Sequence, residues 1–307
     1  MTLHAIVAAL GGALYAGGAR ANVPAPGHSR SDRSVSLLLS GDRLVIHSFG
    51  AASWRAVRDH LHAAGLIDRD GRPAAGPEAG TGGGVGTGVP DPRPDRATRL
   101  AAARRLWAEA GPLTPASLSR RHLVLRAIRT DLAALAGLRH HGAAPLGVYR
   151  ASGATRPALL AAITAPSGGL TAVEVTYLAP GGVRDLRLRT PRKTVGLVPP
   201  GSAVRLAPPA ATLLVGEGVM SVLSASEALG LPGWALLSAH NLAAWTPPAG
   251  VGRVVIAADR GACGEAAAAR LLRRLQRLEV EAIIAPPPGA AEDWNAWATE
   301  KRRKEGT

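Results

Sequence analysis

Two carboxylates stand where apolar runs end in the C-terminal third of this 307-residue chain. Glu217 follows the run 212–216, and Asp259 follows the run 254–258. In a parallel sheet the carboxyl ends of the strands line up along one edge, where ligands bind. Two acids that meet there suit a divalent cation that holds phosphate. The pattern therefore predicts a metal and phosphate site built from Glu217 and Asp259.

Strands and helices alternate through the region that must position these two acids. The pattern predicts strands at 212–216, 233–237, 253–258 and 280–284, and helices at 219–229, 241–245, 264–278 and from Asp293 onward. Such alternation is typical of a parallel sheet joined by right-handed crossovers. We therefore expect an α/β domain over 210–300, flanked by helices, in a chain that is α+β overall. A short basic tail at 301–307 is expected to follow it.

This C-terminal unit resembles the Toprim domain, the metal-binding fold shared by primases, topoisomerases and some nucleases. The matching segments are Glu217-Gly218, Asp259, the helix that starts at Gly264-Glu265, and Asp293-Trp294-Asn295. The resemblance implies that Glu217 acts as a general base or metal ligand and that Asp259 anchors Mg²⁺ or Mn²⁺. It also implies that Asp293 supports the ion.

One expected ligand is missing from the pattern. Family members carry Asp-x-Asp after the later strand, whereas this chain reads Asp259-Arg260-Gly261 and places a cation beside the first acid. Mg²⁺ needs only one or two protein carboxylates, so weak binding of a single ion is expected rather than a tight two-metal site. Taken singly, Glu217 also suits an acid at a helix N-terminus, and Asp259 an ordinary loop carboxylate.

Positive charge concentrates in the middle of the chain. The whole chain has 36 Lys and Arg against 22 Asp and Glu, a net charge of +14, and residues 96–209 hold 17 of the basic groups but only 4 of the acidic ones. This favours a surface that binds a polyanion, although an arginine-rich composition also partly reflects coding bias. Helices are predicted at 96–110 and 114–123, and antiparallel strands at 158–164, 171–178 and 184–189.

Residues 96–300 resemble the combined central and Toprim regions of primase-like proteins carried by phages, plasmids and other mobile elements. The segments that carry the resemblance are Leu106-Trp107, Thr114-Pro115, Val175-Thr176-Tyr177-Leu178, Pro180-Gly181-Gly182 and Val204-Arg205-Leu206. In primases the region before the Toprim domain supplies a basic ridge for the template. The candidates here are Arg187, Arg189, Arg192, Lys193 and Arg205. Arg187 and Arg189 are expected on one face of a strand, where a charged, solvated edge is the other interpretation.

A small module at 1–69 is predicted to contain a helix at 3–16, strands at 34–39 and 43–47, and a helix at 54–64. It resembles the zinc ribbon of the same primases, with His28 and His47 present and the cysteines absent; Cys263 is the only cysteine in the chain. Zinc is therefore not expected.

Apolar packing must then stabilise the N-terminal module. The candidates for this packing are Val45, Phe49, Trp54 and Val57, and the candidates for contacts with DNA are Arg30, Arg33 and Arg43. The segment 70–95 is rich in Gly, Pro, Thr and Asp, a composition that predicts a flexible linker.

The sequence as a whole favours a primase-like DNA replication protein that binds single-stranded DNA and nucleoside triphosphates and carries out Mg²⁺-dependent nucleotidyl transfer. It has no Walker-type phosphate loop, so a separate helicase is expected to unwind DNA. One cysteine and the lack of a bilayer-length apolar segment favour a cytoplasmic location away from membranes. Two alternatives stay open: a catalytically weak nucleic-acid-binding module that recruits other proteins, which the missing ligands favour, and a Toprim nuclease.

Overall fold

The computed structural model describes residues 3–15, 18–30, 32–40, 43–48, 52–68, 70–73, 94–149, 153–188 and 190–305. The chain divides into two compact units, Met1–Gly88 and Val89–Thr307. Most of the linker expected at 70–95 lies outside the described residues. Within the described ranges, no helix combines the length and the apolar character needed to cross a bilayer.

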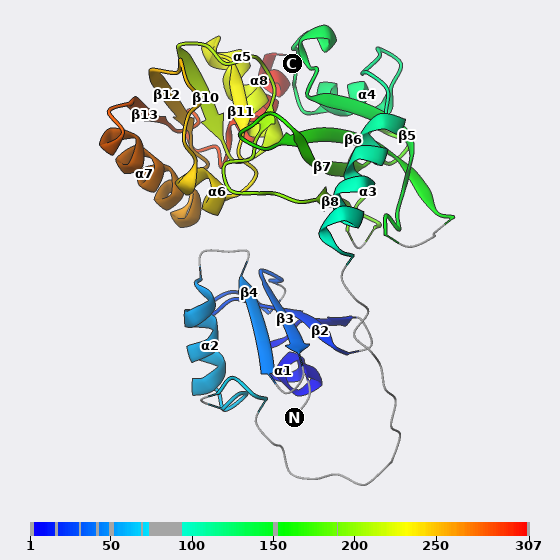
Figure 1. Cartoon of the computed structure of the whole chain (residues 1–307), viewed down its shortest axis with the longest axis vertical. Helices are drawn as coiled ribbons and strands as arrows, with labels where there is room; N and C mark the ends of the chain where they lie inside the picture. The colour runs from blue at the N-terminus through cyan, green and yellow to red at the C-terminus, as the bar shows by residue number, and fades with distance from the viewer. Residues whose placement is uncertain are drawn as a thin grey trace. The chain divides into compact units, whose positions relative to one another are not determined.

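The N-terminal unit contains a four-stranded antiparallel sheet (Figure 1). Its elements are α1 (Leu3–Leu10), β1 (Ala13–Tyr15), β2 (Arg20–Val23), β3 (Val35–Ser40), β4 (Arg43–Ser48) and α2 (Trp54–Ala63), with the strands in the order β1-β2-β3-β4. The β3–β4 hairpin and α2 are where the sequence predicts them, and Ser53 caps α2 through the Ala56 amide. The helix expected to reach residue 16 stops at Leu10 because Gly11 and Gly12 adopt φ of +83° and +136°. The two strands that follow were not predicted.

Apolar side chains from both helices and the sheet fill the core of this unit. Leu3, Ile6, Leu37 and Leu61 are fully buried. Of the packing residues predicted from sequence, Val57 is buried, whereas Val45 and Trp54 are about half exposed and are not core residues. The fourth, Phe49, lies outside the described residues.

The second unit begins with a helical segment and an antiparallel sheet, which we call the central sheet. Its elements are α3 (Arg96–Glu109), α4 (Leu118–Leu125), the 3₁₀ turn Leu132–Ala134, β5 (Leu138–Pro145), β6 (Thr155–Thr164), β7 (Leu170–Tyr177) and β8 (Arg192–Gly196), with strand order β5-β6-β7-β8. The strand expected at 184–189 is wrong, because only an isolated bridge between Leu178 and Arg184 forms there. Asp185 accepts hydrogen bonds from the Arg187 side chain and turns this segment into a loop.

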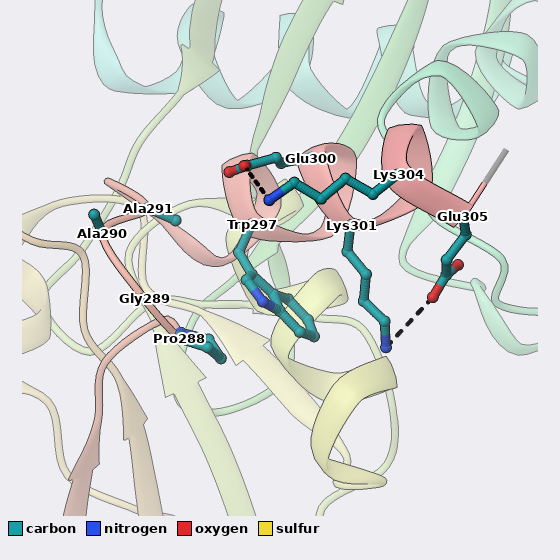
Figure 2. Close-up of a pocket in the computed structure, with 9 residues that line it drawn as sticks. All are labelled: Pro288, Gly289, Ala290, Ala291, Trp297, Glu300, Lys301, Lys304 and Glu305. Atoms are coloured by element: carbon teal, nitrogen blue, oxygen red, sulfur yellow. Dashed lines mark ion pairs between the residues drawn. The ribbon is translucent and has the colours of Figure 1, made fainter. Parts of the chain in front are cut away.

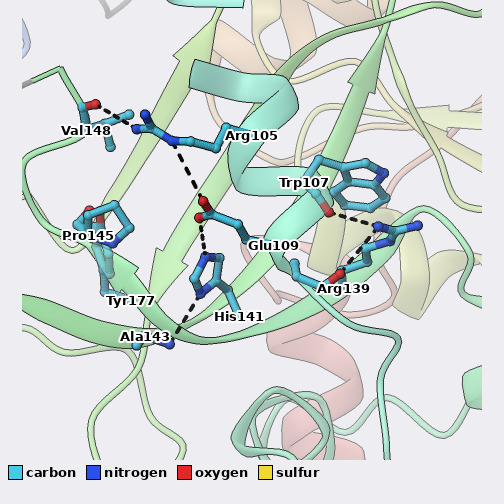
Figure 3. Close-up of polar contacts among 10 residues, drawn as sticks. Arg105, Trp107, Glu109, Arg139, His141, Ala143, Pro145, Val148 and Tyr177 are labelled. Carbon is cyan, nitrogen blue, oxygen red and sulfur yellow. Dashed lines mark hydrogen bonds and ion pairs between the residues drawn. The ribbon is translucent and has the colours of Figure 1, made fainter. Parts of the chain in front are cut away.

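Helix α3 covers one face of the central sheet (Figure 3). Leu106 packs there among buried side chains of β6, β7 and β8. Polar contacts fix the helix at its C-terminal end, where Glu109 lies 3.4 Å from His141 Nε2 and 3.9 Å from Arg105 Nε. Arg139 stacks over the Trp107 ring and donates to its carbonyl oxygen. Because α3 covers this face, the rest of the unit packs against the opposite face of the central sheet.

The chain then forms a five-stranded sheet, which we call the C-terminal sheet. Its elements are β9 (Val204–Arg205), β10 (Thr212–Gly216), α5 (Val219–Leu229), β11 (Gly233–Ala235), α6 (Ala239–Ala244), β12 (Arg253–Ala257), α7 (Ala262–Arg277), β13 (Glu281–Ala285) and α8 (Trp294–Glu305). The order is β13-β12-β10-β11-β9, and all pairs are parallel except that of β11 with the edge strand β9. The expected parallel α/β sheet is confirmed.

Helices lie on both faces of the C-terminal sheet (Figure 1), and alternating side chains of its strands pack against them. Leu213 and Ile256 join the core under α6 and α7, whereas Leu214 and Val255 join the core under α5 and α8. Helix α8 continues through Glu305, so most of the basic segment expected as a separate tail at 301–307 is the end of this helix.

One hydrophobic core joins the central sheet to the C-terminal sheet. Leu159 and Ile163 of β6 belong to the same buried cluster as Leu214, Val222 and Trp294. Asn295 adds polar contacts to this junction, because its side-chain nitrogen donates to the Arg126 carbonyl oxygen and to Ser224 Oγ. This shared core therefore fixes the position of the central sheet relative to the C-terminal sheet.

Candidate functional site

The predicted acids meet at the carboxyl edge of the C-terminal sheet. Gly216 of β10 is paired with Ala257 of β12, so Glu217 and Asp259 leave neighbouring parallel strands at the same end. Both line a cavity of about 490 Å³ together with Asp293, which directly precedes α8. We call this hollow the acid cavity. The structure thus brings together the three carboxylates that the sequence singled out.

Local hydrogen bonds fix two of these carboxylates. Ser221, in the first turn of α5, donates from Oγ to Asp259 Oδ1 over 2.9 Å. Asp293 Oδ1 accepts from the Ala296 amide over 2.6 Å and so caps the start of α8. Gly264 lets α7 approach Asp259 closely, since a Cβ at this glycine would lie 2.5 Å from the Asp259 carbonyl oxygen.

Burial and the charges of neighbouring carboxylates raise the pKa values of Glu217 and Asp259. Burial raises the pKa of Glu217 and the charge of Asp259 raises it further, while Arg192 opposes the shift. Burial also raises the pKa of Asp259; the Ser221 hydrogen bond opposes this, and the charge of Asp293 adds to it. A cation between these groups would relieve the repulsion.

The donor set suits one hydrated divalent ion better than a closed protein cage. Among the described residues, no group of three or more His, Cys, Asp and Glu side chains is arranged to hold a metal. Mg²⁺ usually keeps several waters and uses one or two carboxylates plus substrate phosphate, and Glu217 and Asp259 can supply that pair. In the N-terminal unit, His28 Nδ1 lies 3.2 Å from Asp32 Oδ2, an oxygen that also accepts a hydrogen bond from Ser34 Oγ.

Three arginines from the central part of the unit line the same cavity as the carboxylates. Arg126, Arg184 and Arg192 line the acid cavity together with Glu174. Burial lowers the pKa of Arg126, and the charge of Asp293 opposes that shift. Burial raises the pKa of Glu174, and the charges of Arg192 and Arg184 oppose the shift. The cavity is therefore lined by three carboxylates from the C-terminal part of the unit and by three guanidinium groups and Glu174 from its central part.

Sequence reasoning missed Arg126, Arg184 and Glu174. Glu174 had a visible signal, because it is the only charged residue in the strand Leu170–Tyr177. A carboxylate in an apolar strand is expected to have a partner, and Glu174 lies 4.0 Å from Arg192 Nε. Arg126 and Arg184 follow a helix and a strand and carry no such signal.

Of the four predicted nucleic-acid-binding residues that the structure describes, only Arg192 lines the acid cavity. Lys193 has the opposite orientation on β8: its ammonium lies 5.1 Å from the Tyr177 ring centroid and donates to the Leu146 carbonyl oxygen. Burial lowers the pKa of Lys193 to about 8.

The other three arginines have different surroundings. Arg187 pairs with Asp185 in the loop between β7 and β8, so the expectation that it lies on a strand face is wrong. Arg205 stacks 4.6 Å from the Trp234 ring centroid and donates to the carbonyl oxygens of Ala165 and Pro166. Arg189 lies outside the described residues.

Arg260 does not place its charge beside Asp259 as the sequence suggested. Its guanidinium donates to the carbonyl oxygens of Pro287, Gly289 and Ala291, in the loop before Asp293. Gly261, at the position of the missing aspartate, has φ +100° and ψ +156°, a conformation that is nearly restricted to glycine. Both the side chain and the backbone of this segment therefore differ from what a second acidic ligand requires.

The Arg260-bound loop and α8 enclose a further hollow, of about 580 Å³ (Figure 2). Pro288 and Gly289 form one side of it, and Trp297 points into it from α8. Lys304 is paired with Glu300 over 2.7 Å and Lys301 with Glu305 over 3.8 Å. These two lysines of the supposed basic tail are therefore engaged within α8.

The family comparison places the acid edge in a known class of domain. Residues 212–303 match the model of the Toprim domain, and residues 97–206 match a domain of unknown function, DUF7146. The C-terminal sheet and its helices are therefore a Toprim domain. A sequence search of curated proteins found no match.

The fold also resembles solved primases. The zinc-binding and RNA polymerase domains of the Aquifex aeolicus primase align with 98% of this chain and 81% of theirs, at 14% identity and a TM-score of 0.45. The DnaG primase catalytic domain bound to single-stranded DNA aligns with 69% of this chain and 78% of its own, at 16% identity and a TM-score of 0.46. The primase fragment of the bacteriophage T7 primase-helicase aligns with 58% of this chain and 70% of its own, at 13% identity and a TM-score of 0.40.

Proposed function

We propose that this Toprim protein is a primase-like nucleotidyltransferase that acts on single-stranded DNA at the acid cavity. The observation that carries the proposal is that Glu217, Asp259 and Asp293 line the same hollow as Arg126, Arg184 and Arg192. The carboxylates can hold a cation, and the guanidinium groups can hold phosphate oxygens. Nucleoside triphosphates and a DNA strand are the substrates that such a site would join.

The carboxylates and the arginines of the cavity would have separate roles. Glu217 and Asp259 would hold Mg²⁺ or Mn²⁺ with Asp293 in support, and the ion would neutralise charge on the phosphates. The raised pKa of Glu217 also suits a general base that takes a proton from an attacking hydroxyl. Arg126, Arg184 and Arg192 would orient the triphosphate and the strand by charge. A separate helicase is the partner proposed for unwinding.

Primer synthesis on a single-stranded template tests the activity. Wild-type protein with nucleoside triphosphates and Mg²⁺ or Mn²⁺ is expected to make short oligonucleotides, and Glu217→Gln is expected to abolish them. Glu279→Gln is a matched control, because Glu279 is exposed and precedes β13 at the opposite edge of the sheet. Failure of the wild type to make primers, or equal activity in Glu217→Gln, would refute the proposal.

A second candidate is a catalytically weak module that binds nucleic acid and recruits other proteins. The conformation of Gly261 and the engagement of Arg260 by the loop favour it, since both leave the acid edge with two strand-end carboxylates. This candidate predicts strand binding without primer synthesis. Metal-dependent strand cleavage in the absence of nucleotides would instead indicate a Toprim nuclease.

A further inference from the structure

The rim of the acid cavity carries apolar side chains that face solvent. Leu125 at the end of α4 is 46% exposed, and Val183 and Leu186 in the β7–β8 loop are 52% and 73% exposed. All three line the cavity. We call Leu125, Val183 and Leu186 the apolar lip. Large apolar side chains exposed together beside a charged hollow are typical of a binding surface.

The loop that carries the lip is firmly held. Asp185, immediately before Leu186, is 1% exposed and accepts hydrogen bonds from Arg187 Nε and Nη2 over 2.8 and 3.1 Å. It also lies 3.4 Å from Arg156 Nε on β6. The Asp185 amide donates to the Tyr177 carbonyl oxygen. The exposure of Leu186 is therefore set by a fixed backbone.

A second set of contacts holds the turn that precedes Val183. The Ala179 amide donates to the Val183 carbonyl oxygen, and the Gly182 amide donates to the Ala179 carbonyl oxygen, each over less than 3.0 Å. His122 Nδ1 lies 2.9 Å from the Gly182 carbonyl oxygen and links the turn to α4. Both apolar residues of the loop are thus presented at a defined place on the rim.

The chemistry next to the lip restricts its ligand. Arg184 lies between Val183 and Leu186 in sequence, and Arg126 directly follows Leu125, so each part of the lip adjoins a guanidinium group of the cavity. A fitting ligand combines a weakly polar body with an anionic group. A free phosphate lacks the first part, whereas a nucleotide has both in one small molecule. The volume of about 490 Å³ is within the range of small-ligand pockets.

We propose that the apolar lip packs against the base of a nucleotide whose phosphates face Arg126, Arg184 and Arg192. This inference rests on the proposed function, since it places a nucleotide in the acid cavity. Apolar contact with the face of a base does not depend on which base it is, so the lip would favour nucleotides over bare phosphates without selecting among them. Leu186, the most exposed member, would lose the most surface to solvent on binding.

The proposal is tested by direct binding in the presence of Mg²⁺. The ligands are a nucleoside triphosphate and inorganic triphosphate, and the proteins are wild type, Leu186→Ser and the control Leu278→Ser. Leu278 follows α7, is 46% exposed and is not among the residues that line the cavity. Leu186→Ser is expected to weaken nucleoside triphosphate binding about fivefold and to leave inorganic triphosphate unchanged. Leu278→Ser should change neither.

The outcomes separate the lip from the proposed reaction. Equal effects of Leu186→Ser on both ligands, no effect on either, or no binding of nucleotide by the wild type would refute the proposed contact between the apolar lip and a base. If primers are made while Leu186→Ser binds nucleotide normally, the proposed base contact is wrong and the proposed reaction stands. If no primers are made but the ligand-specific loss is seen, the proposed reaction is wrong and the base contact stands.

The base could belong to a free nucleotide or to the DNA strand. A parallel titration with an oligodeoxythymidylate and an abasic strand of equal length distinguishes the two sources. A Leu186→Ser defect confined to the oligodeoxythymidylate assigns the lip to the strand, and one confined to the triphosphate assigns it to the incoming nucleotide. Val183→Ser serves as a second variant and is expected to show a smaller loss of the same kind.

Discussion

Arg260 donates a hydrogen bond of 2.6 Å from Nη2 to the carbonyl oxygen of Gly289. The same side chain reaches Pro287 and Ala291, and its amide donates to the Glu292 carbonyl oxygen. The residue directly after Asp259 is thus committed to the loop that leads to Asp293. The segments that carry Asp259 and Asp293 are therefore linked through one arginine.

Arg260→Ala should loosen this loop. Loss of its hydrogen bonds to backbone carbonyls is expected to lower the free energy of unfolding by about 1 kcal/mol and to speed amide hydrogen exchange at 289–293. Lysine lacks the planar guanidinium group that makes these hydrogen bonds, so Arg260→Lys should be nearly as destabilised as Arg260→Ala. Arg270→Ala, at an exposed position of α7, is the control. Equal exchange rates in the two alanine variants would show that Arg260 does not hold the loop.

Gly261→Asp is not expected to restore a metal ligand. The space around a Cβ at Gly261 is open, but its φ of +100° opposes any side chain and should cost about 1–3 kcal/mol of stability. Gly252→Asp is the matched control, because Gly252 also has open space and its φ lies outside the left-handed range. We expect Gly261→Asp to unfold more easily than this control without binding Mn²⁺ more tightly. A gain in Mn²⁺ affinity at unchanged stability would contradict the prediction.

Glu217→Gln should change the response of stability to metal. The raised pKa of Glu217 means that the folded protein binds its proton more tightly than the unfolded chain, so stability falls as pH rises above the ordinary glutamate pKa. At neutral pH the substitution is expected to stabilise the protein slightly, by less than about 1 kcal/mol, since the site is partly solvated. It should also remove the rise in melting temperature that we expect Mg²⁺ or Mn²⁺ to cause in the wild type. An undiminished metal-dependent rise would exclude Glu217 as a ligand.

Lys193 should give the stability a distinct dependence on alkaline pH. Burial lowers its pKa from 10.5 to about 8, so between these values the unfolded chain binds more protons than the folded protein. Stability is therefore expected to gain from this group as pH rises from about 8 to 10.5. The free energies of unfolding of wild type and Lys193→Met, measured by denaturant titration at several pH values, should therefore depend on pH with different slopes across this interval. Tyr177, whose pKa burial raises from 10.0 to about 12, opposes this gain near the upper end of the interval, but it is present in both proteins and so cancels in the comparison. Identical slopes would show that the ammonium is ordinarily solvated.

Arg184→Gln and Arg192→Gln should each weaken binding to single-stranded DNA and reduce its dependence on salt. Removal of one phosphate contact is expected to lower the slope of log affinity against log salt by about 0.7. Arg273→Gln, at an exposed position of α7, should leave the slope unchanged. Unaltered slopes in the two cavity variants would mean that the strand binds elsewhere.

The sequence predicted the C-terminal sheet well because its signals are local. Each strand is a continuous apolar run, and Glu217 and Asp259 follow two of them directly. The edge at which they meet follows from the parallel arrangement alone. The central sheet was harder, because β5 (Leu138–Pro145) contains two histidines and an arginine and lacks a clear apolar alternation.

The site was predicted from one side only. The acids follow strands and could be located from the sequence, whereas Arg126 and Arg184 reach the cavity through the packing of one sheet against the other. The orientation of Lys193 away from Arg192 follows strand alternation once β8 is known, but the predicted strand ended before it. The hydrogen bonds of Arg260 depend on a loop that lies some thirty residues further along, and nothing near Asp259 in the sequence reveals them.

The buried cluster that contains both Leu159 and Leu214 has a consequence for dissecting the protein. A fragment that begins near residue 210 would keep Glu217, Asp259 and Asp293, yet it would expose the apolar surface that β6 now covers. Such a piece should aggregate or bind unrelated proteins, however complete its sheet. Experiments on the Toprim domain of this chain therefore require the preceding hundred or so residues to be retained, and insertions for tagging belong outside this unit.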